Sequence, residues 1–248
     1  MLRVKWCGID FGQCLMDPRN LRNKWLWGDI CKKEWKPQLI DERIRRYRIL
    51  KEKYGSYGAI REKGIPEVLS FVLENSNEAL KLYQELTQNY LTPAEGAIDT
   101  LKYLKDEGIK LYVVAELRKT LGPIGTDIVS SFLLKHGLIQ YFDAMVTPQG
   151  KIDFRTHEID YTYCGKTKED GKLYDKLAED LRQQGIQPSE CVMVGDKPET
   201  DIIPAKKRGF HTIQFIGYYD FGPSGADYTI STFPELKNII KGIKSDEK

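Results

Sequence analysis

The stretch that decides the fold is VKWCGIDFGQCL, residues 4–15, an apolar run that ends at Asp10 and passes into a turn. A short apolar run of this kind predicts a buried strand. Later in the chain, similar runs alternate with stretches of helical periodicity; the expected strands are 111–115, 144–147, 191–195, 212–216 and 228–230. Strands that alternate with helices predict parallel βαβ units with right-handed crossovers. We therefore expect an α/β fold built on a layered sheet.

Residues 17–90 interrupt this series directly after the first strand. They show helical patterning and hardly any strand signal. An insertion at this point would lie over the carboxyl ends of the strands, where open α/β sheets bind ligands. We therefore predict a core of residues 1–16 and 91–248 with an α-helical cap of residues 17–90. A later helix is expected over about 124–136, and another over 199–208.

The composition is that of an ordinary globular protein. The 248 residues are 41% hydrophobic and 30% charged, with a formal net charge of +2. This charge gives no preference for nucleic acid or membrane, so the expected partner is a small molecule. The five cysteines have no short pairing or metal-ligand spacing, and no signal peptide or membrane span is evident. We expect a reduced, cytoplasmic protein, as a monomer or a homodimer.

Acidic residues follow the expected strands. Asp10 ends the first strand, Glu116 follows Ala115 at the end of the next, and Asp196 ends the strand 191–195, with Asp201 nearby. Parallel strands bring their carboxyl ends together, so these acids should converge. Clustered carboxylates repel one another unless a cation lies among them, and oxygen-rich sites suit Mg²⁺. The segment Gly165-Lys166-Thr167-Lys168 offers a lysine to the same place.

At these positions the chain resembles the haloacid dehalogenase superfamily, in the branch with a helical cap inserted after the first motif. The resemblance covers nearly the whole chain and implies a Rossmann-like parallel sheet core. It rests on these segments in this order: Asp10 after an apolar strand, Gly108-Ile109-Lys110-Leu111, His136-Gly137-Leu138, Tyr141-Phe142-Asp143, Gly165-Lys166-Thr167-Lys168, and Val194-Gly195-Asp196 with Asp201.

The resemblance implies a role for each matching residue. Asp10 would attack phosphorus and bind Mg²⁺, and Gly12 would offer its backbone carbonyl to the metal. Lys168 resembles the lysine that balances the charge of the nucleophile and the substrate, with Lys166 as the alternative if the register is different. Asp196 resembles a metal ligand. Asp201 resembles the second acid of that motif, which ligates the metal or orients its ligands.

Three positions depart from the family pattern. Gly12 stands where phosphatases carry a second aspartate, the general acid and base, whose help is typically worth about 10²–10⁴-fold in rate. Cys14 replaces a hydroxyl residue, and Ala115 replaces the Ser or Thr that would contact phosphate. Glu116 would either place a carboxylate near the pocket or be solvated at the start of a helix. We favour the solvated position, because exposed acids near helix amino ends are common.

Two classes of function remain open. One is a Mg²⁺-dependent hydrolase of a small phosphorylated compound, working through an aspartyl intermediate on Asp10. The other is a catalytically impaired member that binds a ligand or regulates a partner, as the three departures suggest. A phosphonate-cleaving enzyme is a further alternative, with Lys24, Lys32 or Lys33 forming a Schiff base. The hydrolase is favoured because the chain retains four charged groups of the family pattern: Asp10, Lys168, Asp196 and Asp201.

Two further segments carry side chains of interest. Trp25, Trp27 and Trp35 lie in the predicted cap, and we expect most of them to pack in its interior. Residues 150–164 include Tyr161 and Tyr163 and form either a β-hairpin flap near the site or a surface excursion.

Overall fold

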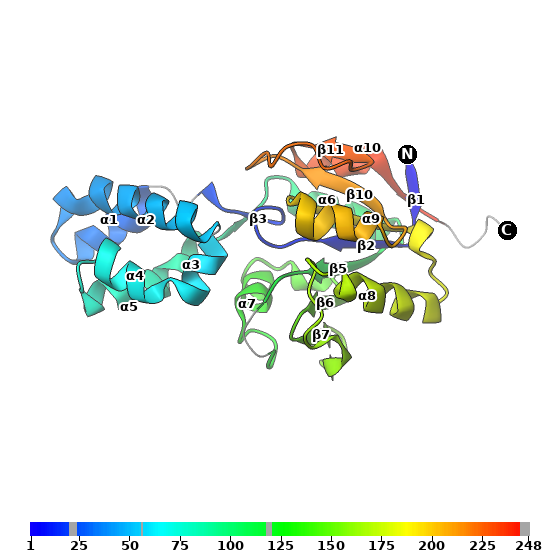
Figure 1. Ribbon diagram of the computed structural model, residues 1–248, viewed down its shortest axis with the longest axis horizontal. Coiled ribbons are helices and arrows are strands. Elements are labelled where there is room, and N and C mark those ends of the chain that lie inside the picture. Colours follow the sequence, from blue (N-terminus) through cyan, green and yellow to red (C-terminus); the bar gives the residue numbers. More distant parts are fainter. Residues whose placement is uncertain (20–23, 56, 118–120, 244–248) are drawn as a thin grey trace. The chain divides into compact units, whose positions relative to one another are not determined.

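The main sheet has eight strands in the computed structural model, which describes residues 1–19, 24–55, 57–117 and 121–243. Their order across the sheet is β11-β10-β9-β2-β5-β6-β7-β8 (Figure 1). The strands are β2 (Trp6–Ile9), β5 (Lys110–Val114), β6 (Ala144–Thr147), β7 (Gly150–Asp153), β8 (Ile159–Asp160), β9 (Cys191–Gly195), β10 (His211–Phe215) and β11 (Tyr228–Ile230).

Neighbouring strands from β11 to β6 run parallel, whereas β7 and β8 add an antiparallel edge. The predicted α/β fold with a mostly parallel sheet is therefore confirmed. The central strands read as apolar runs because helices cover both of their faces. Strand β2, for example, is buried along its whole length.

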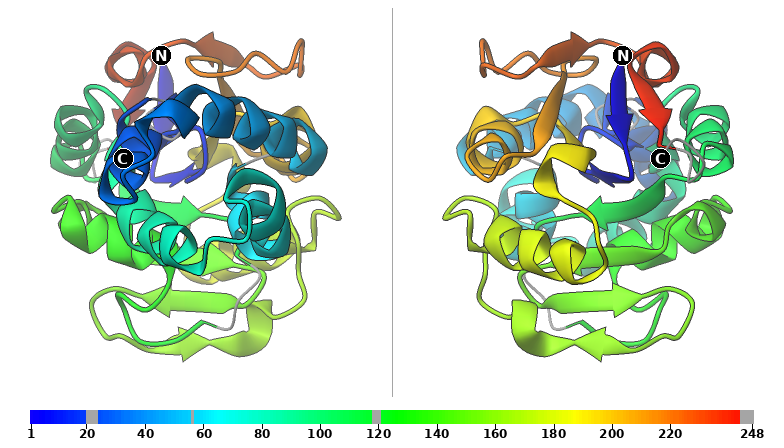
Figure 2. Two further views of the ribbon diagram at one scale, coloured as in Figure 1. Left: turned by 90° about the vertical axis from the view of Figure 1, so that its left-hand side faces the viewer. Right: turned by 90° about the vertical axis from the view of Figure 1, so that its right-hand side faces the viewer.

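Helices lie on both faces of this sheet (Figure 2). One face carries α6 (Ala97–Asp106), α7 (Ile128–Lys135) and α10 (Leu236–Ile239), and the other carries α8 (Lys172–Gln183) and α9 (Ile203–Lys206). Helix α8 illustrates why they form, since Leu173, Leu177 and Leu181 recur at helical spacing and are all buried. Each helix packs its apolar side toward the sheet in this way.

The chain divides into two compact units, Met1–Met16 with Pro93–Lys248, and Asp17–Thr92. A two-stranded sheet of β3 (Met16–Asp17) and β4 (Thr92–Pro93) lies where the chain passes from one unit to the other. A further pair, β1 (Leu2–Val4) and β12 (Ile240–Gly242), joins the two ends of the described chain in parallel.

The second unit is helical. Its helices are α1 (Lys24–Lys33), α2 (Ile40–Tyr54), α3 (Tyr57–Lys63), α4 (Ile65–Glu67) and α5 (Asn77–Thr87), with a π-helical turn at Val68–Val72. Trp27, Tyr47 and Tyr83 form its aromatic centre, where Trp27 stacks on Tyr83 at 5.7 Å between ring centroids. Trp25 and Trp35 are instead exposed. The expectation that most of the tryptophans pack inside is therefore wrong, since only Trp27 does.

Other details also differ from the prediction. The expected helix 124–136 begins only at Ile128, because the Asp127 side chain caps it by accepting hydrogen bonds from Val129 N and Ser130 N, both at 2.8 Å. Residues 150–164 do contain a hairpin, but its strands β7 and β8 extend the main sheet. Tyr163 is buried there and donates a hydrogen bond to Asp180, whereas Tyr161 is exposed.

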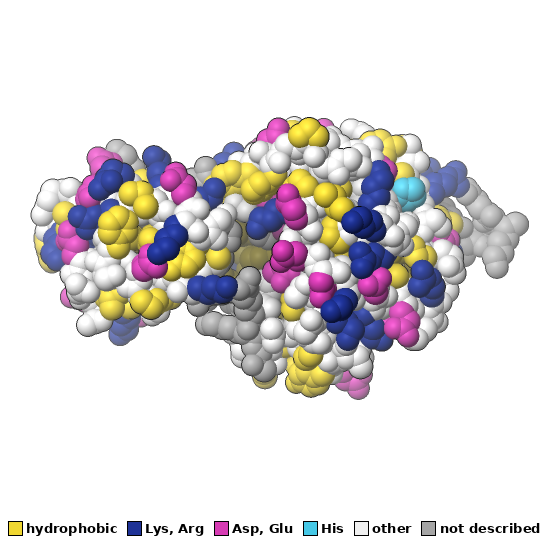
Figure 3. Space-filling model, in the orientation of Figure 1, with side chains coloured by type: hydrophobic (Ala, Val, Ile, Leu, Met, Phe, Trp, Pro, Cys, Tyr) yellow, Lys and Arg dark blue, Asp and Glu magenta, His cyan; other side chains and the backbone are white. Residues whose placement is uncertain are grey.

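Charged side chains of both signs are interspersed on the face shown in Figure 3. This mixture agrees with the small formal net charge of the chain, which is +2. In the described part of the chain, no helix combines the length and the hydropathy needed to cross a bilayer. The five cysteines are free thiols.

Candidate functional site

Asp10 and Asp196 lie side by side because they end neighbouring strands. Strands β2 and β9 are paired in parallel with Ile9 opposite Val194, so the residues after them leave the sheet together. The backbone N–H of Asp10 donates a hydrogen bond to Val194 O at 2.8 Å, which extends the ladder by one more residue. Local apolar patterning and parallel pairing thus place two carboxylates at one edge of the sheet.

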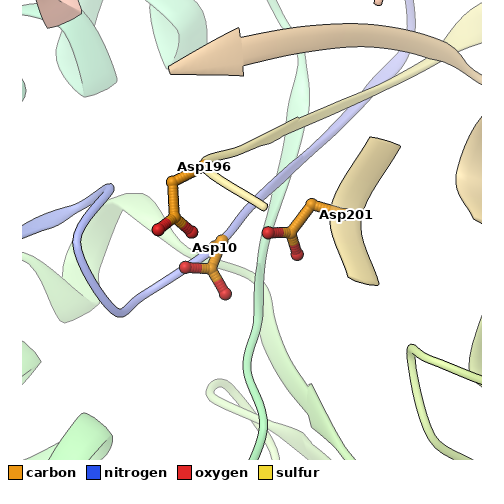
Figure 4. A group of neighbouring side chains, drawn as sticks. All are labelled: Asp10, Asp196 and Asp201. Carbon is orange, nitrogen blue, oxygen red and sulfur yellow. The ribbon is translucent and has the colours of Figure 1, made fainter. Parts of the chain in front are cut away.

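Asp201 joins them from a π-helical turn, Pro198–Ile202. Carboxylate oxygens of Asp10, Asp196 and Asp201 all lie within 4.8 Å of one another, and all three residues are buried (Figure 4). Gly195 makes this approach possible, because a Cβ at this position would lie 2.4 Å from the Cβ of Asp201. Only a glycine leaves room for the turn to fold back against the strand end.

Lys168 bridges two of these acids. Its Nζ donates to Asp10 Oδ1 at 2.5 Å and to Asp201 Oδ1 at 2.6 Å, and the residue is only 1% exposed. Lys166 points elsewhere, since its Nζ donates to the carbonyl of Thr162 at 2.5 Å. Of the two lysines that the sequence offered, the structure brings Lys168 to the acidic cluster.

Burial and crowding shift the pKa values of the cluster. Burial, with a smaller effect of Asp201, raises the pKa of Asp10 to about 6 although Lys168 opposes the rise. Burial, followed by Asp10 and Asp201, raises the pKa of Asp196 well above its ordinary range. For Lys168, burial favours a lower pKa, but attraction to Asp10 and Asp201 outweighs it and the pKa is raised. The ammonium therefore stays charged and neutralises part of the cluster.

Two residues at the site were not assigned a role from the sequence. Lys197 follows Asp196, and its positive charge partly opposes the rise in the pKa of both Asp10 and Asp196. Gln13 is buried, and its Nε2 donates to Asp196 Oδ2 at 3.3 Å. The presence of an amide and a second lysine within the motifs is visible in the sequence, but their direction is set by the backbone of the two loops.

The three departures from the family pattern have structural counterparts. Among the described residues, and apart from its chain neighbours, nothing lies within 4 Å of where a Cβ on Gly12 would be. The N–H of Ala115 donates to Val146 O at 3.0 Å, so neither its side chain nor its own amide can donate to a ligand. Cys14 is fully buried, and burial together with the three acids raises its thiol pKa, so it remains a thiol.

Glu116 is exposed, as expected, but it does not lie at the start of a helix, because α7 begins only at Ile128. Its Oε1 instead accepts a hydrogen bond from the backbone N–H of Lys168 at 2.9 Å. This bond ties the Lys168 loop to the end of β5. Of the lysines considered for a Schiff base, Lys32 and Lys33 are exposed in the last turn of α1, and the side chain of Lys24 lies outside the described part of the structure.

The donor set fits a magnesium ion. Asp10 bonds Lys168 through Oδ1 and Asp196 bonds Gln13 through Oδ2, which leaves the second oxygen of each carboxylate for a cation. Both oxygens of Asp201 accept hydrogen bonds, Oδ1 from Lys168 and Oδ2 from Lys197 N at 3.1 Å. Buried carboxylates in excess over the nearby ammonium groups are the hard oxygen ligands that Mg²⁺ prefers.

Comparison with known proteins agrees with this geometry. The chain matches the family model of haloacid dehalogenase-like hydrolases over residues 36–209. A glyceraldehyde 3-phosphate phosphatase from Methanocaldococcus jannaschii is 26% identical over 204 residues, which cover 80% of this chain and 79% of that protein. A pyrophosphatase PpaX from Halalkalibacterium halodurans is 25% identical over 206 residues, 78% of this chain and 83% of that protein.

Among solved structures, a HAD phosphatase from Thermococcus onnurineus superposes with a TM-score of 0.54 at 21% identity and covers 95% of this chain and 97% of its own. The likeness shows that the two share a fold. Together with the family match, it defines the class of protein: this chain belongs to the haloacid dehalogenase-like hydrolases. It is an enzyme of the hydrolase type that this family comprises.

Proposed function

We propose that this protein is a Mg²⁺-dependent phosphatase that acts on a small phosphorylated compound through an aspartyl intermediate on Asp10. The observation that carries the proposal is the buried cluster of Asp10, Asp196 and Asp201 bridged by the ammonium of Lys168. The phosphatase and pyrophosphatase relatives support the substrate class.

Each group then has a defined task. Asp10 attacks phosphorus through one carboxylate oxygen and keeps the other for the cation, and the bond from phosphorus to the leaving oxygen breaks. Lys168 holds the attacking carboxylate in place and offsets the charge of an incoming phosphate. Asp201 orients Lys168, because its Oδ1 accepts from the Lys168 ammonium while its Oδ2 accepts from Lys197 N. Water then cleaves the aspartyl phosphate and restores Asp10.

Asp10, Asp196 and the carbonyl of Gly12 would hold the cation. When bound, Mg²⁺ supplies charge neutralisation for the phosphate and for the acidic cluster. The helical unit Asp17–Thr92 serves in this proposal as the cap that selects the substrate.

The direct test is turnover of a panel of small phosphate esters and anhydrides with Mg²⁺ and with EDTA. Hydrolysis that requires the cation, together with a mass increase of one phosphoryl group on Asp10 in trapped protein, is the expected result. Absence of turnover across the panel, with intact binding of phosphorylated compounds, would favour the binding or regulatory alternative, which Gly12 and Ala115 suggest.

Restoring an acid at position 12 should raise the rate. The Cβ of Gly12→Asp meets no described neighbour within 4 Å, so the first atom of the new side chain has open space. We expect a gain of about 10-fold or more, which is below the typical general acid–base effect of about 10²–10⁴-fold, because the new group lacks tuned partners. The gain should be largest for alkyl phosphates, whose leaving oxygen most needs a proton, and smallest for p-nitrophenyl phosphate.

Ser189→Asp is the matched control, since it adds the same charge at an exposed position of the core unit. It should leave the hydrolysis rates of alkyl phosphates and of p-nitrophenyl phosphate unchanged. A rate that falls for every ester in Gly12→Asp would show that the site uses different acid–base chemistry from the family.

A further inference from the structure

Gln13 adopts a backbone conformation that is unusual for its residue type. Its φ is +67°, in the left-handed region where a Cβ is crowded and glycine is favoured. Gln13 is buried, with only 5% of its surface exposed, and it lies within the loop that follows Asp10. Strained non-glycine residues persist where their surroundings hold them, and they concentrate at functional sites.

The two ends of the Gln13 amide are treated differently by the protein. Nε2 donates to Asp196 Oδ2 at 3.3 Å, and Asp196 is a 1% exposed carboxylate that lies against Asp10 and Asp201. Oε1 is buried and has no hydrogen-bond partner in the described part of the chain. A buried carbonyl without a partner costs free energy, so stability alone does not account for an amide here.

We propose that Gln13 is a positioning residue for the cation: Nε2 holds the Asp196 carboxylate in its ligand orientation, and Oε1 accepts a hydrogen bond from a water on the cation. The partner of Oε1 then comes from outside the chain, which explains why the described residues supply none. This inference rests on the cation site of the proposed function, but not on turnover.

Two substitutions separate positioning from folding. Gln13→Gly removes the amide and relieves the left-handed strain, so its melting temperature without metal should equal or exceed that of the wild type. Gln13→Met keeps a similar side-chain length without polar atoms. Both should bind Mg²⁺ about 10- to 100-fold more weakly, the effect typical of groups that orient metal ligands. Gln183→Met, at the exposed end of α8, is the matched control and should bind as the wild type does.

The measurements are calorimetric titration of the metal-free full chain with Mg²⁺, electron paramagnetic resonance of bound Mn²⁺, and melting temperature in EDTA. Weaker binding in Gln13→Gly without a lower melting temperature supports the inference. Mg²⁺ affinity equal to that of the wild type in Gln13→Gly overturns the inference. The inference is also overturned if both variants bind Mg²⁺ more weakly but both also melt at a lower temperature. It is also overturned if the wild type binds neither cation.

Activity distinguishes this inference from the proposed function. A wild type that binds Mg²⁺ through Gln13 but hydrolyses nothing would refute the phosphatase and leave the role of Gln13 standing. A wild type that hydrolyses phosphate esters, with Gln13 variants that keep full Mg²⁺ affinity, would support the phosphatase and refute the role of Gln13.

Discussion

Asp10→Asn should abolish turnover and, at neutral pH, stabilise the metal-free protein. Asparagine has nearly the same shape as aspartate, but its amide cannot form the phosphoryl intermediate. Loss of a nucleophile in other hydrolases costs about 10⁶-fold in kcat, so a fall of at least ~10⁴-fold is expected. The loss should appear in kcat at saturating substrate, together with loss of the trapped phosphoryl enzyme.

The stability change follows from the pKa of Asp10, which is raised from 3.8 to about 6 in the folded protein. The folded state therefore favours the neutral carboxyl more than the unfolded state does, and stability falls as the pH rises from about 4 to about 6. Such a shift is worth on the order of 1–3 kcal/mol by pH 7. Asparagine resembles the neutral form, so it should avoid most of this loss.

Denaturant unfolding in EDTA at pH 7.5 and at pH 4 provides the measurement. The stabilisation by Asp10→Asn should be present at pH 7.5 and nearly absent at pH 4. Glu158→Gln, which removes an exposed carboxylate from the core unit, should change neither the rate nor the stability appreciably. An unchanged or lower stability for Asp10→Asn at pH 7.5 would mean that the Lys168 pair, not burial, dominates the energetics of Asp10.

Lys168→Met should destabilise the protein strongly. The substitution keeps the length of the side chain but leaves Asp10 and Asp201 buried without their shared cation. Removing one partner of a buried ion pair typically costs about 3–5 kcal/mol, because the remaining charge is uncompensated. The free energy of unfolding from denaturant titration at pH 7.5 should fall by about that amount.

Lys166→Met is the matched control from the same loop. Its ammonium bonds only a backbone carbonyl, that of Thr162, in the described structure, so the change should be within about 0.5 kcal/mol. The deficit of Lys168→Met should shrink at pH 5, where Asp10 and Asp196 hold more protons because their pKa values are raised, and on addition of Mg²⁺, which replaces the lost positive charge. Equal stability of the two variants would show that the acidic cluster does not need Lys168.

Much of the fold follows from patterns that lie close together in the sequence. Apolar runs separated by amphipathic helices require a mostly parallel sheet, and the strand order then brings the residues after β2 and β9 to one edge. The convergence of Asp10 and Asp196 is a consequence of that pairing. Helix boundaries were less predictable, because a cap such as Asp127 competes with the helical signal of the residues before it.

What the sequence by itself determined is that Asp10 and Asp196 meet at the strand ends, since this depends only on periodicity and parallel pairing. The sequence favoured Lys168 over Lys166 only by resemblance, and the tertiary structure shows that Lys168 reaches the acids, because the loop turns the two side chains in different directions. The tertiary structure likewise decided that Gln13 faces Asp196, which depends on a left-handed backbone turn. Such directions are set by contacts between residues far apart in the chain, and no local pattern encodes them.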